Sequence, residues 1–248
     1  MTAMTNDLAT PASALVIVAH PDDAEFQAGA TLAKWSRSGA VVHHLVLTDG
    51  SKGTWDPSTD QAELVTRRQG EQRAAAGALG ATGECVFLGE IDGELRTDTD
   101  SRGRVAEVIR RLRPEVILGH DPWKRYRLHP DHHAAGRLCI DGIVAARDPF
   151  FHPEQLRDGL VPHRPDALLL FEADEANHIE SVHEQDLEAR NAALEAHVSQ
   201  METTHFYRVG EGDPLEGFRR RERQRLERGG ADAGIPLAER YHLIVDQL

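Results

Sequence analysis

Two short stretches of the sequence bring histidine and aspartate together in a pattern suited to binding a metal ion. The first is "HPDD" at positions 20–23, and the second is "HPDHH" at positions 129–133. Neighbouring carboxylates repel one another, and a divalent cation removes that repulsion and lowers the cost of burying them. Histidine together with carboxylate is a common ligand set for a catalytic zinc ion, which takes three protein ligands and keeps its fourth position open.

The spacing within the motifs indicates which residues could hold the ion. His20 and Asp23 are three residues apart, so both side chains can face one ion, and His132 can supply the third ligand. Asp22 is then adjacent to the ion without binding it, which is where a general base for an attacking water belongs. Zinc would bring the pKa of that water to about 7. Zinc is the first expectation for this ligand set, although Fe²⁺ fits the same residues.

The second motif also contains candidates for proton transfer and for orientation. His129 can face a developing oxyanion or protonate a leaving amine, and Asp131 can orient a ligand histidine. His133 is expected to face away from the ion. Either motif alone is explained as well by a turn whose aspartate caps a helix. Their joint occurrence, each after a predicted strand, favours the metal site.

The elements that must position these motifs are read from the apolar pattern. Short apolar runs rich in β-branched residues are typical of strands buried on both faces of a sheet. They alternate with stretches of helical spacing, which predicts an α/β fold with a Rossmann-like, mostly parallel sheet and helices on both faces. The predicted strands are 14–19, 41–48, 85–89, 114–120, 166–173 and 240–245, and the predicted helices are 23–38, 61–79, 101–112, 185–201 and 215–227. The segment 148–165 is expected to be a long loop.

The predicted strand ends place the motifs at one edge of that sheet. Ligands of open α/β sheets bind beyond the carboxyl ends of the strands. The first motif follows strand 14–19 directly, Asp49 follows strand 41–48, and His120 and Asp121 stand at the end of strand 114–120. The second motif comes a few residues later, so both motifs are expected to reach the same site.

Length and composition set the class of protein. The 248 residues, 40% of them hydrophobic, suffice for one large core. We expect a flexible N-terminal tail at 1–13 and a single domain at 14–248 with a variable C-terminal part. The net charge of −13 argues against nucleic acid or an anionic membrane as a partner, and Glu222 and Glu227 interrupt the basic run at 218–228. Two cysteines, no membrane-spanning apolar run and no signal-peptide pattern indicate a cytoplasmic protein.

These features resemble the LmbE-like, or PIG-L, family of zinc-dependent N-acetylglucosaminyl deacetylases. The resemblance is carried by "AHPDDAEF", "TDGSKG", "RRQGEQRAAAGALG", "LGEIDGEL", "HPDHHAAG" and "ALEAHVSQM", and it runs from about residue 15 to about residue 201. It implies that zinc is held by His20, Asp23 and His132, that Asp22 is the general base, that His129 is the acid or oxyanion group, and that Asp131 stands beside it.

The resemblance also implies residues that contact the substrate. Arg68 and Asp92 match positions that contact the sugar or its aglycone, although Arg67 could take the place of Arg68. An arginine on a helix surface and a turn residue are the plain alternatives for the two positions. His197 matches a recurring histidine that helix packing explains equally well. Some family members have a tyrosine where this chain has Arg127, so a tyrosine role near the reaction centre is not carried over.

The function implied is hydrolysis of the acetamido group of a small amino-sugar conjugate, which yields acetate and a free amine. One alternative is an amidase that removes a larger acyl group, such as a thiol-conjugate amide. The other is a non-enzymatic metal- or sugar-binding module, which would not need a base at Asp22. The specific substrate and the formation of a homo-oligomer stay open at this point.

Overall fold

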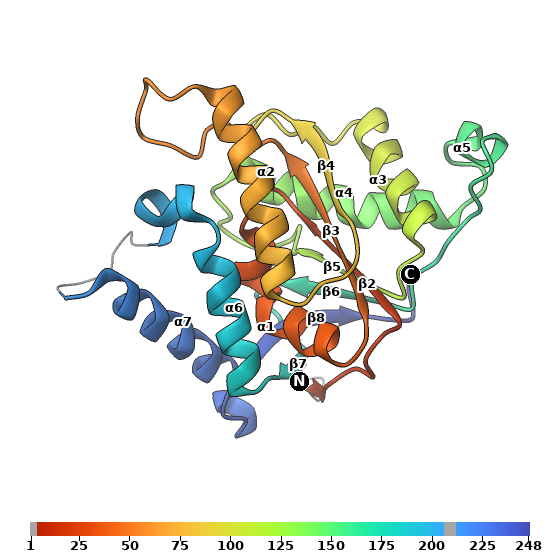
Figure 1. Ribbon diagram of the computed structural model, residues 1–248. Helices are drawn as coiled ribbons and strands as arrows, with labels where there is room; N and C mark the ends of the chain where they lie inside the picture. Colours follow the sequence, from red (N-terminus) through yellow and green to blue (C-terminus); the bar gives the residue numbers. More distant parts are fainter. Residues whose placement is uncertain (1–3, 206–211) are drawn as a thin grey trace.

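The computed structural model describes residues 4–205 and 212–248, and within them the chain forms an eight-stranded sheet with helices on both faces (Figure 1). The strands are β1 (Thr5–Asn6), β2 (Ser13–Val18), β3 (Val41–Thr48), β4 (Cys85–Glu90), β5 (Val116–His120), β6 (Ala167–Phe171), β7 (His178–Ser181) and β8 (Ala238–Ile244). The α-helices are α1 (Asp23–Arg37), α2 (Gln61–Ala78), α3 (Thr99–Leu112), α4 (Pro130–Arg147), α5 (Pro153–Arg157), α6 (Glu184–Glu195) and α7 (Pro214–Gly230). Shorter helical turns are η1 (Val198–Gln200), η2 (Met201–His205) and η3 (Ala231–Ala233).

The sheet is mostly parallel, as the alternation of strands and helices predicts. Its strand order is β1-β7-β8-β6-β5-β2-β3-β4, and β8 runs antiparallel to both β6 and β7. The five strands from β2 to β6 are parallel and follow the doubly wound order, in which the chain crosses from one half of the sheet to the other between β4 and β5. The neighbours β2 and β5 therefore flank the switch point, where such sheets bind ligands.

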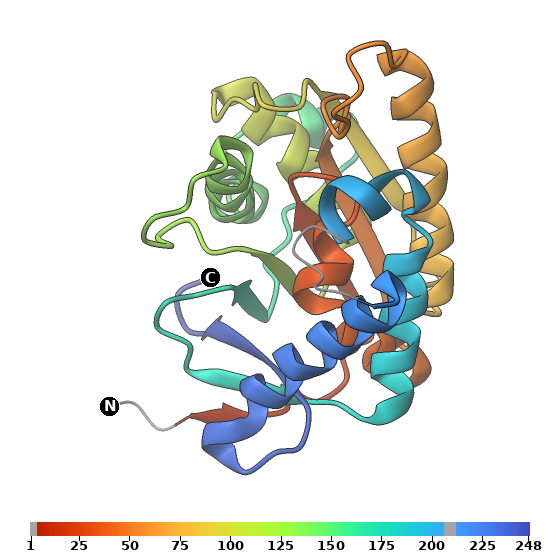
Figure 2. The same cartoon turned by 90° about the vertical axis from the view of Figure 1, so that its left-hand side faces the viewer.

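Alternate residues of β2 face two separate apolar layers. Val16 packs in the layer that contains Trp35 of α1, whereas Ile17 packs in the layer that contains Val105 of α3 and Ile143 of α4. Figure 2 shows the corresponding arrangement, with α3 and α4 on one side of the sheet and α1, α2 and α6 on the other. A strand covered on both faces needs apolar residues at every position, which explains the continuous apolar run.

The structure differs from the sequence-based expectations in the last third of the chain. The predicted loop at 148–165 contains α5, and the helix predicted at 185–201 ends at Glu195 and continues as the turns η1 and η2. The strand β7 was not predicted. It is only four residues long, and it is stabilised by pairing with β8 and β1 rather than by a local apolar pattern.

The described part of the expected N-terminal tail, residues 4–13, is held against the domain. Strand β1 pairs with β7, and the backbone N–H of Leu8 donates to Glu180 Oε1 at 2.8 Å. The carboxylate of Asp7 accepts a hydrogen bond from Lys34 Nζ at 2.8 Å. These contacts join residues 5–8 to β7 and α1, and the flexibility expected for residues 1–13 stays a prediction.

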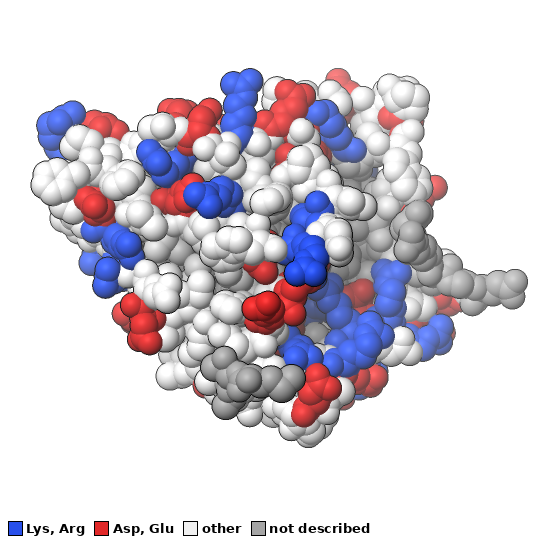
Figure 3. Space-filling model, turned by 180° about the vertical axis from the view of Figure 1, so that it is seen from behind, with Lys and Arg blue, Asp and Glu red and all other residues white. Residues whose placement is uncertain are grey.

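The surface charges are mixed in sign. Seen from behind, Lys and Arg gather near α7, with acidic side chains among them (Figure 3). Two arginines of α7 pair with carboxylates of α6, because Arg219 contacts Glu195 and Arg223 contacts Glu184. This basic run is therefore a paired helix face. Among the described helices, none is both long enough and apolar enough to cross a bilayer.

Candidate metal centre

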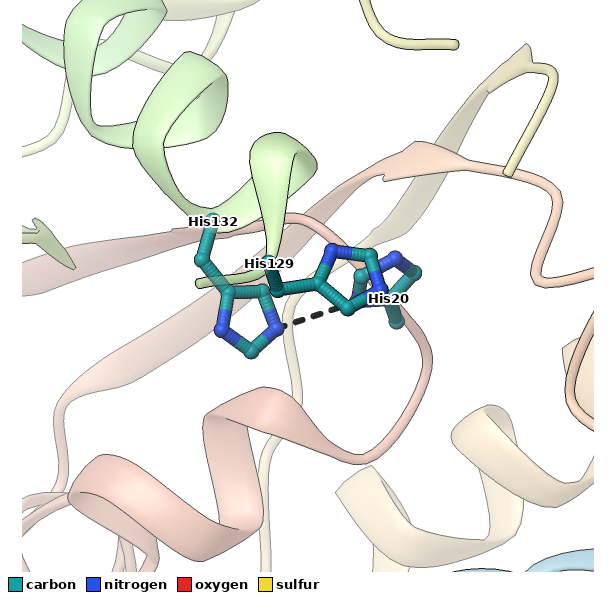
Figure 4. Close-up of side chains that lie close together, drawn as sticks. All are labelled: His20, His129 and His132. Atoms are coloured by element: carbon teal, nitrogen blue, oxygen red, sulfur yellow. Dashed lines mark hydrogen bonds between the residues drawn. The ribbon is translucent and has the colours of Figure 1, made fainter. Parts of the chain in front are cut away.

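Both predicted motifs lie at the switch point of the sheet. His20 follows β2 by two residues, and His120 is the last residue of the neighbouring β5. Helix α4 begins at Pro130 and has His129 as its N-cap. Proline suits this first position because it has no backbone N–H that would need a hydrogen-bond acceptor. Figure 4 shows that the rings of His20, His129 and His132 gather between the end of β2 and the start of α4.

The three predicted metal ligands lie side by side. His20 Nδ1 is 3.2 Å from His132 Nε2 and 3.3 Å from Asp23 Oδ2. The other oxygen of Asp23, Oδ1, is 3.2 Å from His132 Nε2. Three donors at this mutual spacing can reach one small cation.

The opposite side of the His20 ring is held by carboxylates. His20 Nε2 lies 3.1 Å from Asp131 Oδ2 and 3.3 Å from Asp92 Oδ1. Asp131 is itself fixed, because it accepts hydrogen bonds from the backbone N–H groups of Gly93 and Leu95. A carboxylate at Nε2 takes the proton-bearing side of the ring and leaves the lone pair of Nδ1 for an ion.

The electrostatic balance of the site suits a cation. Asp22, Asp23, Asp92 and Asp131 are each no more than 6% exposed. Burial disfavours the charged form of His20, but hydrogen bonds with three of these carboxylates outweigh it and raise the pKa of His20 well above its ordinary value. A divalent ion would supply the positive charge that this cluster attracts, so the residues present fit a bound metal.

His120 is a further histidine at the site that the sequence-based ligand set did not include. It is fully buried, and neither ring nitrogen makes a hydrogen bond within the described residues. Its Nε2 is 3.4 Å from Asp23 Oδ2, and its ring stacks on that of His132 with centroids 4.5 Å apart. Burial lowers the pKa of His120 to about 4, so its ring stays neutral. Asp23, His120 and His132 therefore form a second possible ligand group.

Asp22 occupies a strained position beside the predicted ligands. It precedes α1 with φ of 103°, a left-handed conformation that L-residues rarely adopt, and its side chain makes no capping hydrogen bond. Burial raises the pKa of Asp22 to about 6, although the guanidinium of Arg68, 3.6 Å away, opposes the shift. The carboxylate is thus held near the ligands without being used in the helix cap.

Arg68 and Asp92, the predicted substrate contacts, are both engaged within the protein. Arg68 is only 3% exposed, so it is not a surface arginine, and it donates to the carbonyls of Gly50 at 2.9 Å and Pro21 at 2.7 Å. Asp92 is 6% exposed and accepts from the N–H of Lys52 at 3.1 Å as well as contacting His20. Both side chains border the site, and most of their polar atoms already contact other groups of the protein.

His129 is the exposed histidine of the group. Its ring centroid is 4.6 Å from that of His20 and 4.9 Å from that of His132. Its Nδ1 accepts the N–H of Asp131 at 3.3 Å. Although the residue is exposed overall, partial burial of its ring and the neighbouring rings of His20 and His132 lower the pKa of His129. A neutral ring that accepts at Nδ1 carries its proton at Nε2. His133 is exposed, as expected.

The basic residue that precedes the second motif is already paired. Arg127 Nη1 lies 3.0 Å from His132 Nδ1, and its Nη2 lies 2.6 Å from Glu172 Oε2. Its guanidinium therefore lies against the ring of His132, near the position where some members of the resembled family have a tyrosine.

Fold and site together describe an α/β protein with a candidate metal centre at the switch point of its sheet. The family model PIG-L, described as GlcNAc-PI de-N-acetylase, matches residues 15–143. The chain belongs to this PIG-L, or LmbE-like, family, which confirms the resemblance drawn from the motifs.

The names of the relatives include two different activities, deacetylation and hydration. The diacetylchitobiose deacetylase of Thermococcus kodakarensis is 36% identical over 186 residues, which are 75% of this chain and 69% of that protein. The N,N'-diacetylchitobiose deacetylase structure from Pyrococcus horikoshii is 27% identical, with a TM-score of 0.84 over 95% of this chain and 84% of that one. A 4-oxalmesaconate hydratase of Pseudomonas putida is 31% identical over 165 residues, which are 62% of each protein.

Proposed function

We propose that the protein removes the acetyl group from a small N-acetyl amino-sugar conjugate, with His20, Asp23 and His132 as the ligands of a zinc ion. One observation carries the proposal. The three side chains converge to within 3.2–3.3 Å of one another beside Asp22, a buried carboxylate that remains free of them. A metal-binding module without catalysis has no use for a base in that position.

The roles of the chain's own residues follow from their contacts. A zinc ion held there would supply Lewis-acid polarisation and a lowered pKa for water. Asp22 takes the proton of the water that attacks the acetyl carbon, and its pKa of about 6 places it closer to neutral pH than an ordinary aspartate. The Nε2 proton of His129 hydrogen-bonds the carbonyl oxygen as charge develops, and it can then pass to the leaving nitrogen.

Two further aspartates keep the first ligand in position. Asp131 and Asp92 accept at His20 Nε2, so this ring keeps one tautomer and one orientation. Arg68 and Asp92, which we expected to contact the sugar, then act mainly by shaping the site from behind, because each is nearly buried. Fe²⁺ would fit the same ligands.

The substrate class rests on the relatives. Two matched proteins are named diacetylchitobiose deacetylases. A cavity of about 710 Å³ is lined by the loop between β3 and α2, including Lys52 and Trp55, and Lys52 is bonded to Asp92 of the site. An amino sugar with a second group attached could extend into this cavity. Removal of a larger acyl group is the nearest alternative.

Hydration is the second candidate reaction, because a relative of 31% identity is named 4-oxalmesaconate hydratase. A base beside a metal can direct water to an acetyl carbon or to a polarised double bond. The contacts around Asp22 serve either reaction, so the substrate decides between them.

The test is a panel assay with zinc-loaded protein and with chelator-treated protein. The panel contains N-acetylglucosamine, diacetylchitobiose, their N-butyryl counterparts and an unsaturated dicarboxylate for hydration. Metal-dependent release of a free amine and acetate from the acetylated sugars is the expected result. Release from the butyryl compounds only would favour the amidase, loss of the double bond would favour the hydratase, and no turnover by metal-loaded protein would favour a binding module.

A further inference from the structure

Three buried side chains behind the metal centre have no role in the mechanism above. They are Glu25 of α1, Gln72 of α2 and His197, which lies between α6 and η1, and all three are fully buried. Gln72 belongs to the motif "RRQGEQR" and His197 to the motif "AHVSQ". Neither metal binding nor proton transfer explains why these two residues are present. Polar groups are rarely buried this deeply without hydrogen-bond partners, so their partners indicate their role.

Helix α2 holds both ends of one peptide group in the first motif. Arg68 Nη2 donates to the carbonyl oxygen of Pro21 at 2.7 Å, and the N–H of Asp22 donates to Gln72 Oε1 at 3.0 Å. This carbonyl and this N–H belong to the same Pro21–Asp22 peptide plane. Arg68 and Gln72 are four residues apart and therefore lie on one face of α2. From that face, Arg68 binds the carbonyl of the peptide group and Gln72 binds its N–H.

These two hydrogen bonds fix the strained conformation of Asp22. Helix α1 begins at the next residue, Asp23, so the backbone after Asp22 is already set. The orientation of the Pro21–Asp22 plane then determines φ of Asp22, which is 103°. A residue remains in such a sparsely populated region only where its surroundings over-determine it. The two hydrogen bonds from α2 supply that constraint.

The orientation of the Gln72 amide is itself determined. Its Nε2 donates to Glu25 Oε1 at 2.7 Å, and His197 Nε2 lies 3.3 Å from Glu25 Oε2. Since the NH₂ group of Gln72 is bonded to the Glu25 carboxylate, the amide oxygen of Gln72 is the atom that faces the N–H of Asp22.

The segment that carries His197 is anchored to the same surroundings. Ser199 donates to both oxygens of Glu71, through its N–H at 2.9 Å and its hydroxyl at 2.6 Å. Gln200 Nε2 donates to the carbonyl of Gly53 at 3.0 Å. The turn after α6 therefore docks on α2 and on the loop that follows β3, which keeps His197 against Glu25.

We propose that Gln72 is a positioning residue that holds the general base Asp22 in its left-handed conformation, and that Glu25 and His197 orient its amide. The role of Asp22 as a base rests on the proposed function, whereas the clamp on its backbone does not. Gln72 touches neither the reacting atoms nor the ligands, so it acts through Asp22.

The first test is a double-mutant cycle in the zinc-loaded protein. Gln72→Met removes both hydrogen bonds and should lower kcat by about 10- to 100-fold, because the base is misplaced, with little change in KM or zinc content. In an Asp22→Asn background the same substitution should lower kcat less than about twofold further, because the residue it positions is already lost. Gln69→Met, the same exchange three residues earlier on α2, should leave kcat unchanged. An equal loss in both backgrounds would overturn the proposal.

The orientation step has its own pair of variants, which also serves if Gln72→Met does not fold. Glu25→Gln still accepts from Gln72 and should retain most of kcat, whereas Glu25→Met cannot accept and should lose as much as Gln72→Met. Equal activities of the two Glu25 variants would contradict the orienting role.

A crystal structure of Gln72→Met keeps this test separate from the proposed function. The clamp predicts that the Pro21–Asp22 peptide turns and that φ of Asp22 leaves the left-handed region, whether or not the protein hydrolyses amides. An unchanged φ near 103° would overturn the proposal. Absence of any deacetylation by the wild-type protein would instead count against the proposed function alone.

Discussion

Asp131 combines three contacts that bear on the candidate metal centre. It accepts from the N–H groups of Gly93 and Leu95 and lies 3.1 Å from His20 Nε2. Asn at this position keeps the shape but loses the charge and one acceptor. We therefore expect Asp131→Asn to weaken zinc binding by about 10- to 100-fold, measured by competition with a chromogenic chelator. Asp166→Asn, at an exposed position, is the matched control, and unchanged affinity in Asp131→Asn would argue against an orienting role.

His129 should contribute to the rate rather than to metal binding. Its ring is exposed, and its Nδ1 is occupied by the N–H of Asp131. His129→Ala should lower kcat by about 100-fold or more, as expected for loss of a proton donor or oxyanion group. Steady-state kinetics and zinc content would be compared with those of His133→Ala, its exposed neighbour. Loss of zinc together with activity would show instead that His129 is a ligand.

Between elements, the buried side chain of Arg190 joins α6 to both α1 and α7. Arg190 of α6 donates to the carbonyls of Glu25 and Phe26 in α1 and to Glu222 Oε2 in α7, the last at 2.8 Å. The arginine crosses α1 at Gly29, where an added Cβ would lie 2.8 Å from Arg190 Cγ. The C-terminal helix is thus attached to the helix that follows the first metal motif.

The ion pair between Arg190 and Glu222 predicts a pH-dependent stability. Burial would raise the pKa of Glu222, but Arg190 outweighs it and holds the pKa below its ordinary value of 4.5. A lowered folded-state pKa means that the stabilisation is complete above about pH 4.5 and is lost as the pH falls through the folded-state value. Glu222→Gln should cost roughly 2 kcal/mol at pH 7, because Arg190 then keeps one carboxylate partner, Glu239, whose Oε1 is 3.6 Å from Arg190 Nε.

Urea unfolding at several pH values would measure this effect. The difference between wild type and Glu222→Gln should shrink as the pH drops below about 4.5. Glu216→Gln, an exposed position on the same helix, should change little at any pH. A difference that stays constant with pH would show that the ion pair is not the source of the stability.

How far sequence predicts structure here depends on how local the signal is. Strand β2 and helix α1 carry complete local patterns, and their predicted bounds agree to within one residue. Strand β1 pairs with residues more than 170 positions away and has no apolar pattern, so it was not predicted. Each of the two His-Asp motifs is local as well, and the pairing of β2 with β5 brings them together, which is why the three predicted ligands lie adjacent to one another.

The unpredicted parts of the site depend on contacts between distant elements. The bond from Asp22 to Gln72 spans 50 positions, and His120 reaches Asp23 from β5, the strand next to β2. The spacing of four between Arg68 and Gln72 was visible, because it places both on one helical face. That both residues bind the Pro21–Asp22 peptide group could be recognised only once α2 had been placed beside the first motif.

For the molecule as a whole, metal and folding should be linked. Zinc at a hundredfold excess over its Kd adds about 2.7 kcal/mol of stability, which for a chain of this size raises Tm by roughly 5–10 °C. The rise should appear when zinc is added to chelator-treated protein and should be absent in His132→Ala. His133→Ala is the matched control and should respond like wild type. An equal rise in His132→Ala would place the bound zinc elsewhere.

The most direct measurement of the central claim is acetate release from diacetylchitobiose by wild type and by Asp22→Asn, each carrying the same measured amount of zinc. The proposed function predicts metal-dependent release by wild type and a loss of kcat of about 100-fold or more in the variant, because the carboxylate that accepts the proton of water is gone. Equal rates in the two zinc-loaded proteins would contradict the account, since they would show that the buried carboxylate beside the ligands is not the base.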